Sequence, residues 1–220
     1  MDTAEFDYPL PAELIAQHAI EPRDAARLLV AARDHGAAVH RTVADLDQLL
    51  HPGDLLVLNR TQVIPARLLG RKVSGGAVEV LLIHRDGTGN DGGERWRCLV
   101  RGGVRPGTVI QLDGISATIA VCDDEQGDRL IDFPAGCAAL ALAERIGHIP
   151  LPPYIRRADE PIDRTRYQTV FADRPGSVAA PTASLHLTQA LLDRLAARGV
   201  QRSLVELAIG PGTFKPVTSA

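Results

Sequence analysis

Between residues 66 and 133 the sequence runs through six short apolar or alternating segments: ARLLGRKV (66–73), AVEVLLIH (77–84), WRCLVR (96–101), TVIQL (108–112), ISATIAVC (115–122) and RLIDF (129–133). Glycine-rich breaks separate them. Segments of this kind, bounded by turn residues, predict β-strands, and six in succession predict a small β-barrel or sandwich. The longest break, RDGTGNDGGER (85–95), predicts a flexible hairpin loop. A predicted helix, CAALALAERIG (137–147), follows the last strand.

The flanking segments predict a mixed α/β unit. Its predicted strands are RLLVAARD (27–34) and AAVHRTV (37–43), which turn at His35-Gly36, then a buried DLLVLN (54–59), YQTVFA (167–172) and SLVELAIG (203–210). Its predicted helices are AELIAQH (12–18), ADLDQLL (44–50) and LTQALLDRLAARG (187–199). The proline-rich stretch 147–161 excludes regular structure. We therefore predict an α/β fold: a barrel-like, mixed α/β main domain (1–65 plus 147–220) interrupted by an inserted small all-β barrel domain (66–146).

Composition indicates a folded protein without membrane segments. The chain has 220 residues and 45% hydrophobic content, enough for one domain with a real core or two modest ones. No apolar run approaches the roughly 20 residues that a spanning helix needs, and the N-terminus lacks the pattern of a signal peptide. The three cysteines form no CxxC pair. We expect a cytoplasmic protein with reduced thiols and no membrane partner.

The charge pattern leaves two interpretations open. The net charge of −3 gives no global attraction to nucleic acid. Only two of the 24 basic residues are lysine, and arginine forks suit phosphate recognition. Many arginines fall into two groups: Arg95, Arg97, Arg101 and Arg105, then Arg156, Arg157, Arg164 and Arg166. Clustering on one face would favour an RNA partner, whereas dispersed, solvated arginines would favour a small-molecule substrate.

Five long stretches carry most of the functional information, because Walker, GxSxG and zinc-binding patterns are missing from the sequence. They are FDYPLPAELIA (6–16), LLHPGDLLVLNRTQVIPARLLGRK (49–72), GHIPLPPYIRR (147–157), RYQTVFADRPGSVAAPTASLHLT (166–188) and LAIGPGTFKPV (207–217). In this order they resemble the S-adenosylmethionine:tRNA ribosyltransferase-isomerase family of queuosine biosynthesis. The resemblance runs from Phe6 to Val217.

This resemblance implies an unusual reaction. The ribosyl part of S-adenosylmethionine is transferred to the 7-aminomethyl-7-deazaguanine base of tRNA and isomerised, which gives epoxyqueuosine and releases adenine and methionine. S-adenosylmethionine is then a consumed substrate, tRNA is a partner, and the chemistry requires no metal. The site must remove a proton next to the sulfonium, stabilise the departing adenine and orient the amine.

Several polar residues in these stretches are candidates for the site. His186 ends a loop before a predicted helix, where a base can reach a substrate, although a lone histidine is often structural. The candidate substrate-binding residues are Asn59, Thr61, Arg67, Tyr167, Gln168, Thr169, Thr182, Gly210, Gly212 and Thr213. Arg67 would meet a carboxylate or an RNA phosphate. The glycines would admit a ligand to the backbone or merely permit a turn with positive φ.

The sequence departs from the family pattern at five positions. Where the family has asparagine-aspartate-threonine-arginine, this chain has Asn59-Arg60-Thr61-Gln62, so we expect a local ion pair or ligand contact to be lost or rewired. Ser184 replaces a glycine and Leu187 a phenylalanine. Ala208 replaces a histidine and cannot act as an acid or base there.

Family members also continue past the GTF-P-V motif. We therefore expect a fragment, half of a split enzyme, or a short relative in which a homo-oligomer contact or second chain completes the α/β domain. The leading interpretation is the tRNA-modifying enzyme. The alternatives are a diverged or truncated relative acting on a small-molecule acceptor and a non-catalytic RNA- or ligand-binding module.

Overall fold

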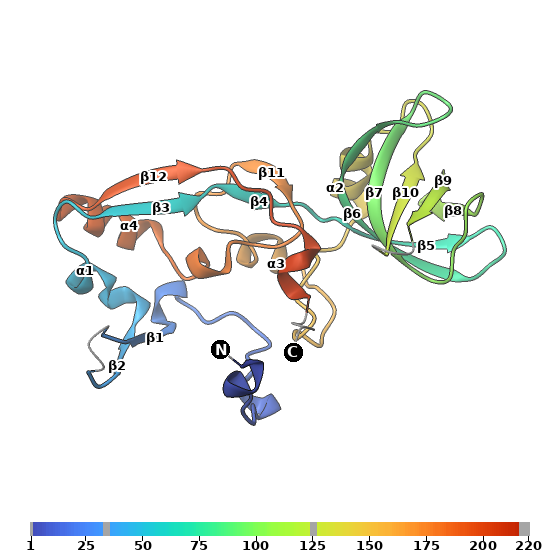
Figure 1. The fold of residues 1–220 in the computed structure, drawn as a ribbon. Helices are drawn as coiled ribbons and strands as arrows, with labels where there is room; N and C mark the ends of the chain where they lie inside the picture. The colour runs from blue at the N-terminus through green and yellow to red at the C-terminus, as the bar shows by residue number, and fades with distance from the viewer. Residues whose placement is uncertain (1, 33–35, 124–126, 216–220) are drawn as a thin grey trace.

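The computed structural model describes residues 2–32, 36–123 and 127–215. Figure 1 shows a β-barrel at one end and an elongated α/β part at the other, joined by the two chain segments that precede and follow the barrel. The fold is therefore mixed α/β, as the sequence predicts. Among the described residues no helix is long and apolar enough to cross a membrane.

The barrel contains one strand for each of the six predicted segments: β5 (Arg67–Lys72), β6 (Ala77–Thr88), β7 (Glu94–Arg101), β8 (Val109–Leu112), β9 (Ile115–Asp123) and β10 (Asp128–Asp132). Neighbouring strands are antiparallel, and the ring closes in the order β10-β7-β6-β5-β8-β9. Its interior is filled by side chains with no exposed surface, among them Leu68, Leu82, Ile110, Ile119 and Phe133. A closed barrel, not an open sandwich, is the outcome.

The hairpin predicted over residues 85–95 forms between β6 and β7, but its loop is much shorter than predicted. Strand β6 continues to Thr88 and β7 begins at Glu94, so the connection is only five residues long. Glycine is needed here for packing: a Cβ on Gly93 would lie 1.9 Å from the backbone oxygen of Phe133. Gly87, with φ of +135°, sits at a register shift between the two strands. Glycines that suggested flexibility instead allow close strand contact.

The α/β part contains two parallel strand pairs. Strand β3 (Leu55–Asn59) pairs with β12 (Gln201–Val205), and β4 (Thr61–Val63) pairs with β11 (Arg174–Ser177). Helix α4 (Gln189–Ala197) covers one face of the first pair. The core there combines Leu58 and Val200 with Leu191, Leu192 and Leu195 of the helix.

The buried strand predicted over residues 54–59 is only half correct. Leu58 is 2% exposed, but Leu55 and Val57, which alternate with the inward side chains, are 57% and 55% exposed. Parallel strands are normally covered on both faces. Within the described residues, no element covers the outer face of the β3–β12 pair.

The strand predicted over residues 167–172 is absent, and pairing starts only at β11. Helix α3 (Asp163–Arg166) precedes a turn at this position. The guanidinium of Arg23 donates to four backbone carbonyl groups, those of Thr165, Arg166, Gln168 and Leu185. Those carbonyls at the turn are therefore not available to a sheet ladder. The Gln168 side chain instead pairs with both backbone groups of Val63, at 2.9 and 2.7 Å.

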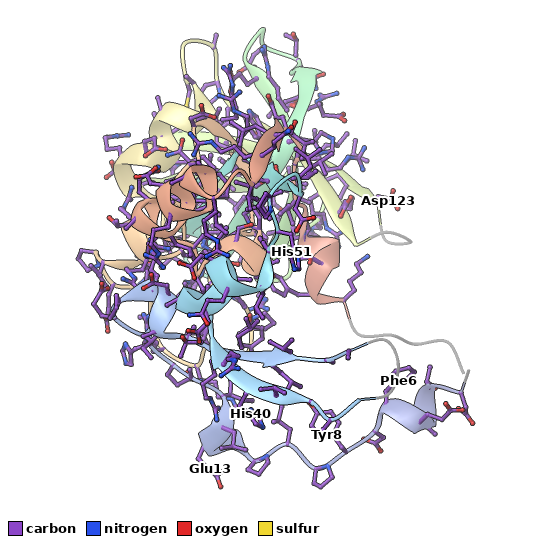
Figure 2. The ribbon with its side chains drawn as sticks, turned by 90° about the vertical axis from the view of Figure 1, so that its left-hand side faces the viewer. Phe6, Tyr8, Glu13, His40, His51 and Asp123 are labelled. Carbon is purple, nitrogen blue, oxygen red and sulfur yellow. The ribbon has the colours of Figure 1, made fainter. Side chains whose placement is uncertain are left out.

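The N-terminal segment is less regular than predicted. Of the helix expected over 12–18 only the 3₁₀ turn η2 (Ala12–Leu14) forms, beside η1 (Thr3–Phe6), because its side chains are exposed and have no apolar surface to pack against. Gln17 instead bonds the backbone of Tyr154 and Arg156. Figure 2 shows Phe6 and Tyr8 projecting from this segment; they are 64% and 67% exposed.

The predicted hairpin is confirmed: β1 (Arg27–Val30) pairs antiparallel with β2 (Val39–Thr42). Its turn was predicted at His35-Gly36, and His35 lies outside the described residues. The remaining elements are η3 (Arg23–Ala25), η4 (Val43–Asp45), α1 (Leu46–Leu49), α2 (Ala139–Ile146), η5 (Thr182–Ser184) and η6 (Pro211–Phe214). Residues 147–161 form no helix or strand, as their prolines predict. All three cysteines are free.

Candidate functional site

A cavity of about 440 Å³ lies where the barrel meets the α/β part; we call it the junction pocket. Strands β5, β6 and β7 supply one wall, and the proline-rich segment and η6 supply the others. Its charged lining consists of Arg67, Glu79, Arg101 and Arg157, and its apolar lining includes Leu81, Leu151, Ile155, Val178 and Phe214. A concave, mostly apolar site with a few convergent charges is typical of small-molecule pockets.

Arg67, a residue predicted for substrate binding, lines this pocket. Its Nε lies 3.2 Å from Glu79 Oε2, and its Nη1 lies 3.8 Å from Asp159 Oδ1. Its backbone exchanges two hydrogen bonds with His148, at 3.2 and 2.9 Å. The guanidinium is about one-third exposed, so it stays accessible while two carboxylates fix its direction.

A histidine that the sequence did not single out stands beside Arg67. His148 Nδ1 lies 2.8 Å from Asp159 Oδ1, and the other carboxylate oxygen accepts the backbone N–H of Ile149 at 3.0 Å. The two residues are eleven positions apart across an irregular proline-rich stretch, so no spacing rule predicts their contact. One indication of this pair was present in the sequence: His148 lies in the family-like stretch 147–157, and Asp159 follows that stretch by two residues.

Asn59, Thr61 and Gln168 are used to join strands. Asn59 bonds both backbone groups of Leu207, at 2.9 and 3.1 Å. The Thr61 hydroxyl lies 2.6 Å from that of Ser177, which accepts the Ile209 N–H at 2.7 Å. Gln168 holds Val63, as described above. These side chains position strands β3, β4, β11 and β12, the elements that frame the segment leading to η6.

Tyr167 and Thr169 lie inside the protein. Tyr167 packs with Val63, Ile149 and Ala180, and burial raises the pKa of its hydroxyl to about 12. The Thr169 hydroxyl is buried without a hydrogen-bond partner among the described residues. Because Ile149 belongs to the segment that lines the junction pocket, Tyr167 supports that wall from behind.

His186 and Thr182 lie apart from the junction pocket lining. Both are exposed, Thr182 on η5 and His186 in the turn before α4. Thr188 caps that helix: its hydroxyl accepts the Leu191 N–H at 3.1 Å and donates to Asp24 at 3.0 Å. The helix start next to His186 is thus already capped by the protein itself.

Gly210, Gly212 and Thr213 lie at η6, whose Pro211 and Phe214 line the junction pocket. The interpretation that these glycines permit a turn with positive φ is wrong, since neither has a positive φ. A Cβ added at either glycine would meet nothing within 4 Å among the described residues. The fold of the described chain therefore does not itself require glycine at these two positions.

Arg60, which stands where the family has aspartate, pairs with Asp173. Its guanidinium forms a two-pronged ion pair with Asp173, at 2.6 Å for the Nε–Oδ1 contact, which raises the pKa of Arg60 and lowers that of Asp173. Arg60 therefore takes part in an ion pair within the protein. Ser184 and Leu187 are buried, Leu187 in the core beneath α4, whereas Ala208 is exposed.

Most of the grouped arginines are engaged within the fold. Arg95 pairs with Asp132 at 2.6 Å, Arg97 with Asp128 at 3.4 Å, and Arg157 with Asp163 at 2.7 Å. Arg164 donates to the Gly147 carbonyl, and Arg166 contacts Glu21. These residues do not form one cationic face.

A separate cationic surface exists at the end of the barrel, which we call the barrel tip (residues 71–76 and 101–108). These two turns contain Arg71, Lys72, Arg101 and Arg105 and no acidic residue. A hollow of about 560 Å³ between them is lined by Lys72, Arg105, Ser74 and Thr108, among others. Lys72 bonds backbone carbonyls, and Arg105 has no ion pair among the described residues.

Among the described residues, no group of three or more histidine, cysteine, aspartate or glutamate side chains is arranged to hold a metal ion. Cys98 is fully buried in the barrel, and burial raises the pKa of its thiol well above the usual range. Such a thiol is chemically inert. The charged groups of the junction pocket therefore remain the main candidates for chemistry.

Comparison with known proteins gives a consistent match. The family model described as "Queuosine biosynthesis protein" matches residues 3–220. The S-adenosylmethionine:tRNA ribosyltransferase-isomerase of Anaeromyxobacter sp. (strain Fw109-5) is 52% identical over 219 residues, which cover 99% of this chain and 63% of that protein. The protein of the same name from Pelobacter propionicus is 48% identical over 97% of this chain and 62% of its own length.

Among solved structures, S-adenosylmethionine tRNA ribosyltransferase from Thermotoga maritima aligns with a TM-score of 0.38 and 35% sequence identity, covering 94% of this chain and 58% of that chain. The chain thus spans a little under two thirds of the length of the curated relatives it matches.

Proposed function

This chain belongs to the family of queuosine biosynthesis proteins, and we propose that it carries out S-adenosylmethionine:tRNA ribosyltransferase-isomerase chemistry. In this proposal it consumes S-adenosylmethionine, transfers and isomerises the ribosyl group onto the 7-aminomethyl-7-deazaguanine base of tRNA, and releases adenine and methionine. Epoxyqueuosine in tRNA is the product, and the cytoplasm is the place of action. We further propose that residues 66–146 are a domain inserted between 1–65 and 147–220.

The junction pocket is the observation that carries this proposal. S-adenosylmethionine has a carboxylate, a cationic sulfonium and a flat aromatic base, and the pocket offers a complement to each. Arg67 suits the carboxylate because guanidinium and carboxylate pair with two hydrogen bonds. Glu79 offers negative charge near a sulfonium. Leu151, Ile155 and Phe214 offer apolar surface for adenine.

Two other predicted groups can contribute from the edges of the pocket. The glycines of η6 leave open space through which a ligand can approach the backbone closely. Tyr167 packs in one cluster with Ile149 and Leu151 and so supports the wall formed by residues 149–155. The catalytic role of His186 and the substrate-binding role of Thr182 stay predictions. Either residue can take part only if the substrate extends from the junction pocket toward η5.

We place the tRNA contact at the barrel tip. The two turns contain four cations and no acidic residue, and among the described residues Arg101 alone of the four lies near a carboxylate, that of Glu79 at 3.8 Å, so phosphates would be attracted there although the whole chain is acidic. Charge reversal of Arg105 should weaken tRNA binding in fluorescence anisotropy and reduce its salt dependence. The reversal of Arg174, an exposed arginine outside the tip, is the control; equal losses in both variants would remove the tip from the interface.

We also propose that further polypeptide, either a second copy or another chain, covers the outer face of β3 and β12. The exposed apolar residues of that face are Leu55 and Val57 of β3, which alternate with the inward-facing Leu56 and Leu58. An open parallel pair with an apolar outer face invites such a contact.

The function is tested by titrating the chain with S-adenosylmethionine in a calorimeter and analysing the mixture chromatographically for adenine, with and without tRNA that carries the 7-deazaguanine base. Adenine release that requires tRNA is the expected result. Release without tRNA would support the small-molecule alternative, which the internal pairing of most arginines favours. If the chain neither binds S-adenosylmethionine nor releases adenine, both enzymatic interpretations are refuted.

A further inference from the structure

We propose that His148, oriented by Asp159, is the group that transfers protons in the junction pocket. This inference rests on the proposed function and assigns a residue that the sequence had not marked. It comes from the contact between the two side chains and from their position beside Arg67.

The hydrogen bond fixes which imidazole nitrogen is available. Asp159, whose side chain is 12% exposed, lies with Oδ1 2.8 Å from His148 Nδ1. An ionised carboxylate can only accept, so Nδ1 carries the proton and Nε2 presents a lone pair. The Ile149 N–H, at 3.0 Å, holds the second carboxylate oxygen. This is the arrangement by which an aspartate orients a histidine base and stabilises its protonated form.

His148 is not itself among the residues that line the junction pocket, but the backbone places it directly opposite Arg67, which does line it. His148 and Arg67 exchange both backbone hydrogen bonds, and residues directly opposite in an antiparallel pair project to the same face. Both side chains reach Asp159, and Arg67 lines the pocket. The His148 side chain is 40% exposed, so a substrate in the pocket can approach it.

The preceding glycine makes this position rigid. A Cβ on Gly147 would lie 1.9 Å from the backbone oxygen of Pro65, so only glycine lets the returning chain approach the start of β5 this closely. The Gly147 carbonyl also accepts a hydrogen bond from Arg164 at 2.7 Å. The imidazole is thus mounted on backbone fixed from both sides, which a proton-transfer group requires.

The chemical step balances without another reactant. His148 Nε2 takes the proton from the carbon next to the sulfonium, and the electron pair of that C–H bond stays on carbon. The resulting imidazolium is stabilised by Asp159. The electron pair on that carbon then forms a double bond to the neighbouring ring carbon as the bond from this ring carbon to the ring oxygen breaks. The ring oxygen forms a carbonyl bond to the ribose carbon that holds adenine, and the electron pair of the carbon–adenine bond leaves with adenine. The imidazolium returns the proton to the adenine nitrogen, and the sulfonium keeps its positive charge. The histidine ends the step neutral.

His186 is the competing assignment, since the sequence favours it. Its ring is exposed, and its side chain has no hydrogen bond or ion pair within the described part of the chain. It therefore lacks the carboxylate that fixes the ring of His148. The two histidines can be separated by experiment.

The test compares adenine release by the full chain with release by His148→Gln, Asp159→Asn and His186→Gln variants. His51→Gln is the matched control, because His51 also lies near a carboxylate, Asp54, but on an exposed turn outside the pocket. We expect His148→Gln to lower kcat by about 100-fold or more with little change in KM, and Asp159→Asn to lower it less. His51→Gln should match the parent.

Nitrogen-15 NMR of the histidine rings gives a readout that a merely structural role would not move. In the parent, His148 should show a protonated Nδ1 and an unprotonated Nε2, and Asp159→Asn should abolish this preference. Adding S-adenosylmethionine should shift the His148 ring signals and leave those of His51 in place.

The outcomes separate the inference from the function on which it rests. Suppose that the parent binds S-adenosylmethionine and releases adenine, that His148→Gln does the same, and that the ligand does not move the His148 signals of the parent. The inference is then refuted and the proposed function stands. If turnover is lost in His186→Gln alone, that residue takes the role. If the parent neither binds S-adenosylmethionine nor releases adenine, the proposed function fails, and this assignment falls with it.

Discussion

The barrel and the β3–β12 pair solve the problem of burying strands in opposite ways. Every barrel strand has two neighbours, and its inward side chains, such as Leu82 and Ile119, are completely buried. Within the part of the chain that the structure describes, the β3–β12 pair has only two strands, a helix on one face and exposed leucine and valine side chains on the other. The barrel is closed by its own residues, whereas the β3–β12 pair leaves an apolar surface exposed.

The difference follows from sequence separation. All barrel partners lie within residues 67–132, so the barrel closes by short connections. Strands β3 and β12 start at residues 55 and 201, and β4 and β11 at residues 61 and 174. Such pairing carries a larger loop-closure cost and depends on side chains that join distant segments. Asn59, Thr61 and Gln168 supply those joints.

The largest expected effect separates two leucines. Leu82→Ala should lower the free energy of unfolding by about 2–5 kcal/mol, because it leaves a cavity in a closed core. Leu55→Ala, on the outer face of β3, should change it by no more than about 0.5 kcal/mol. Urea unfolding measures both. A similar large loss in both variants would show that the outer face of β3 is already covered in solution.

The second largest effect is expected from the loss of the Ser177 hydrogen bonds that connect segments far apart in the sequence. Ser177→Ala removes the partner of the Thr61 hydroxyl in a buried contact and the acceptor of the Ile209 N–H in a partly buried one. We expect a loss of about 1–3 kcal/mol in the free energy of unfolding. Replacing Thr61 by valine as well should restore part of it by removing the unsatisfied hydroxyl. Additive losses in the double variant would contradict the direct coupling.

The pH dependence tests one ion pair in each part. Hydrogen bonds from Arg95 lower the pKa of Asp132 in the barrel, and those from Arg157 lower the pKa of Asp163 in the α/β part. A carboxyl with a folded-state pKa below its unfolded value of about 4 stabilises the protein above that pH and loses this contribution as the pH falls through the lowered pKa. The free energy of unfolding should therefore decline below about pH 4.

Denaturant unfolding as a function of pH measures this decline. Asp132→Asn and Asp163→Asn should each flatten it. An unchanged slope in either variant would mean that its pair persists in the unfolded chain or does not form.

The smallest effect on stability is expected from Val57→Lys. Its side chain is 55% exposed, so the free energy of unfolding should change by about 0.5 kcal/mol or less. Light scattering should nevertheless show weaker self-association, because a charge then occupies the apolar outer face of β3. Identical association in the parent and the variant would exclude this face as a contact between copies.

The sequence by itself determined the local elements. Six glycine-bounded apolar segments predicted the barrel strands, and the leucines of residues 187–199 predicted helix α4, because period and turn chemistry are local properties. The sequence-based predictions of a long loop over residues 85–95 and of a strand over residues 167–172 were wrong. In the first, Gly93 serves close packing against Phe133; in the second, Arg23 occupies carbonyls from a distance. Neither reason is visible in a local window.

The family resemblance brought Arg67 and the GPGTF stretch into consideration, and only the tertiary structure placed them around one pocket. The tertiary structure also brings together His148 and Asp159, which no motif or spacing linked, and pairs Arg60 with Asp173 across 113 positions. Sequence determines which side chains can do chemistry. Which of them meet depends on how an irregular, proline-rich segment returns across the start of β5, because long-range packing sets that path and local preference does not.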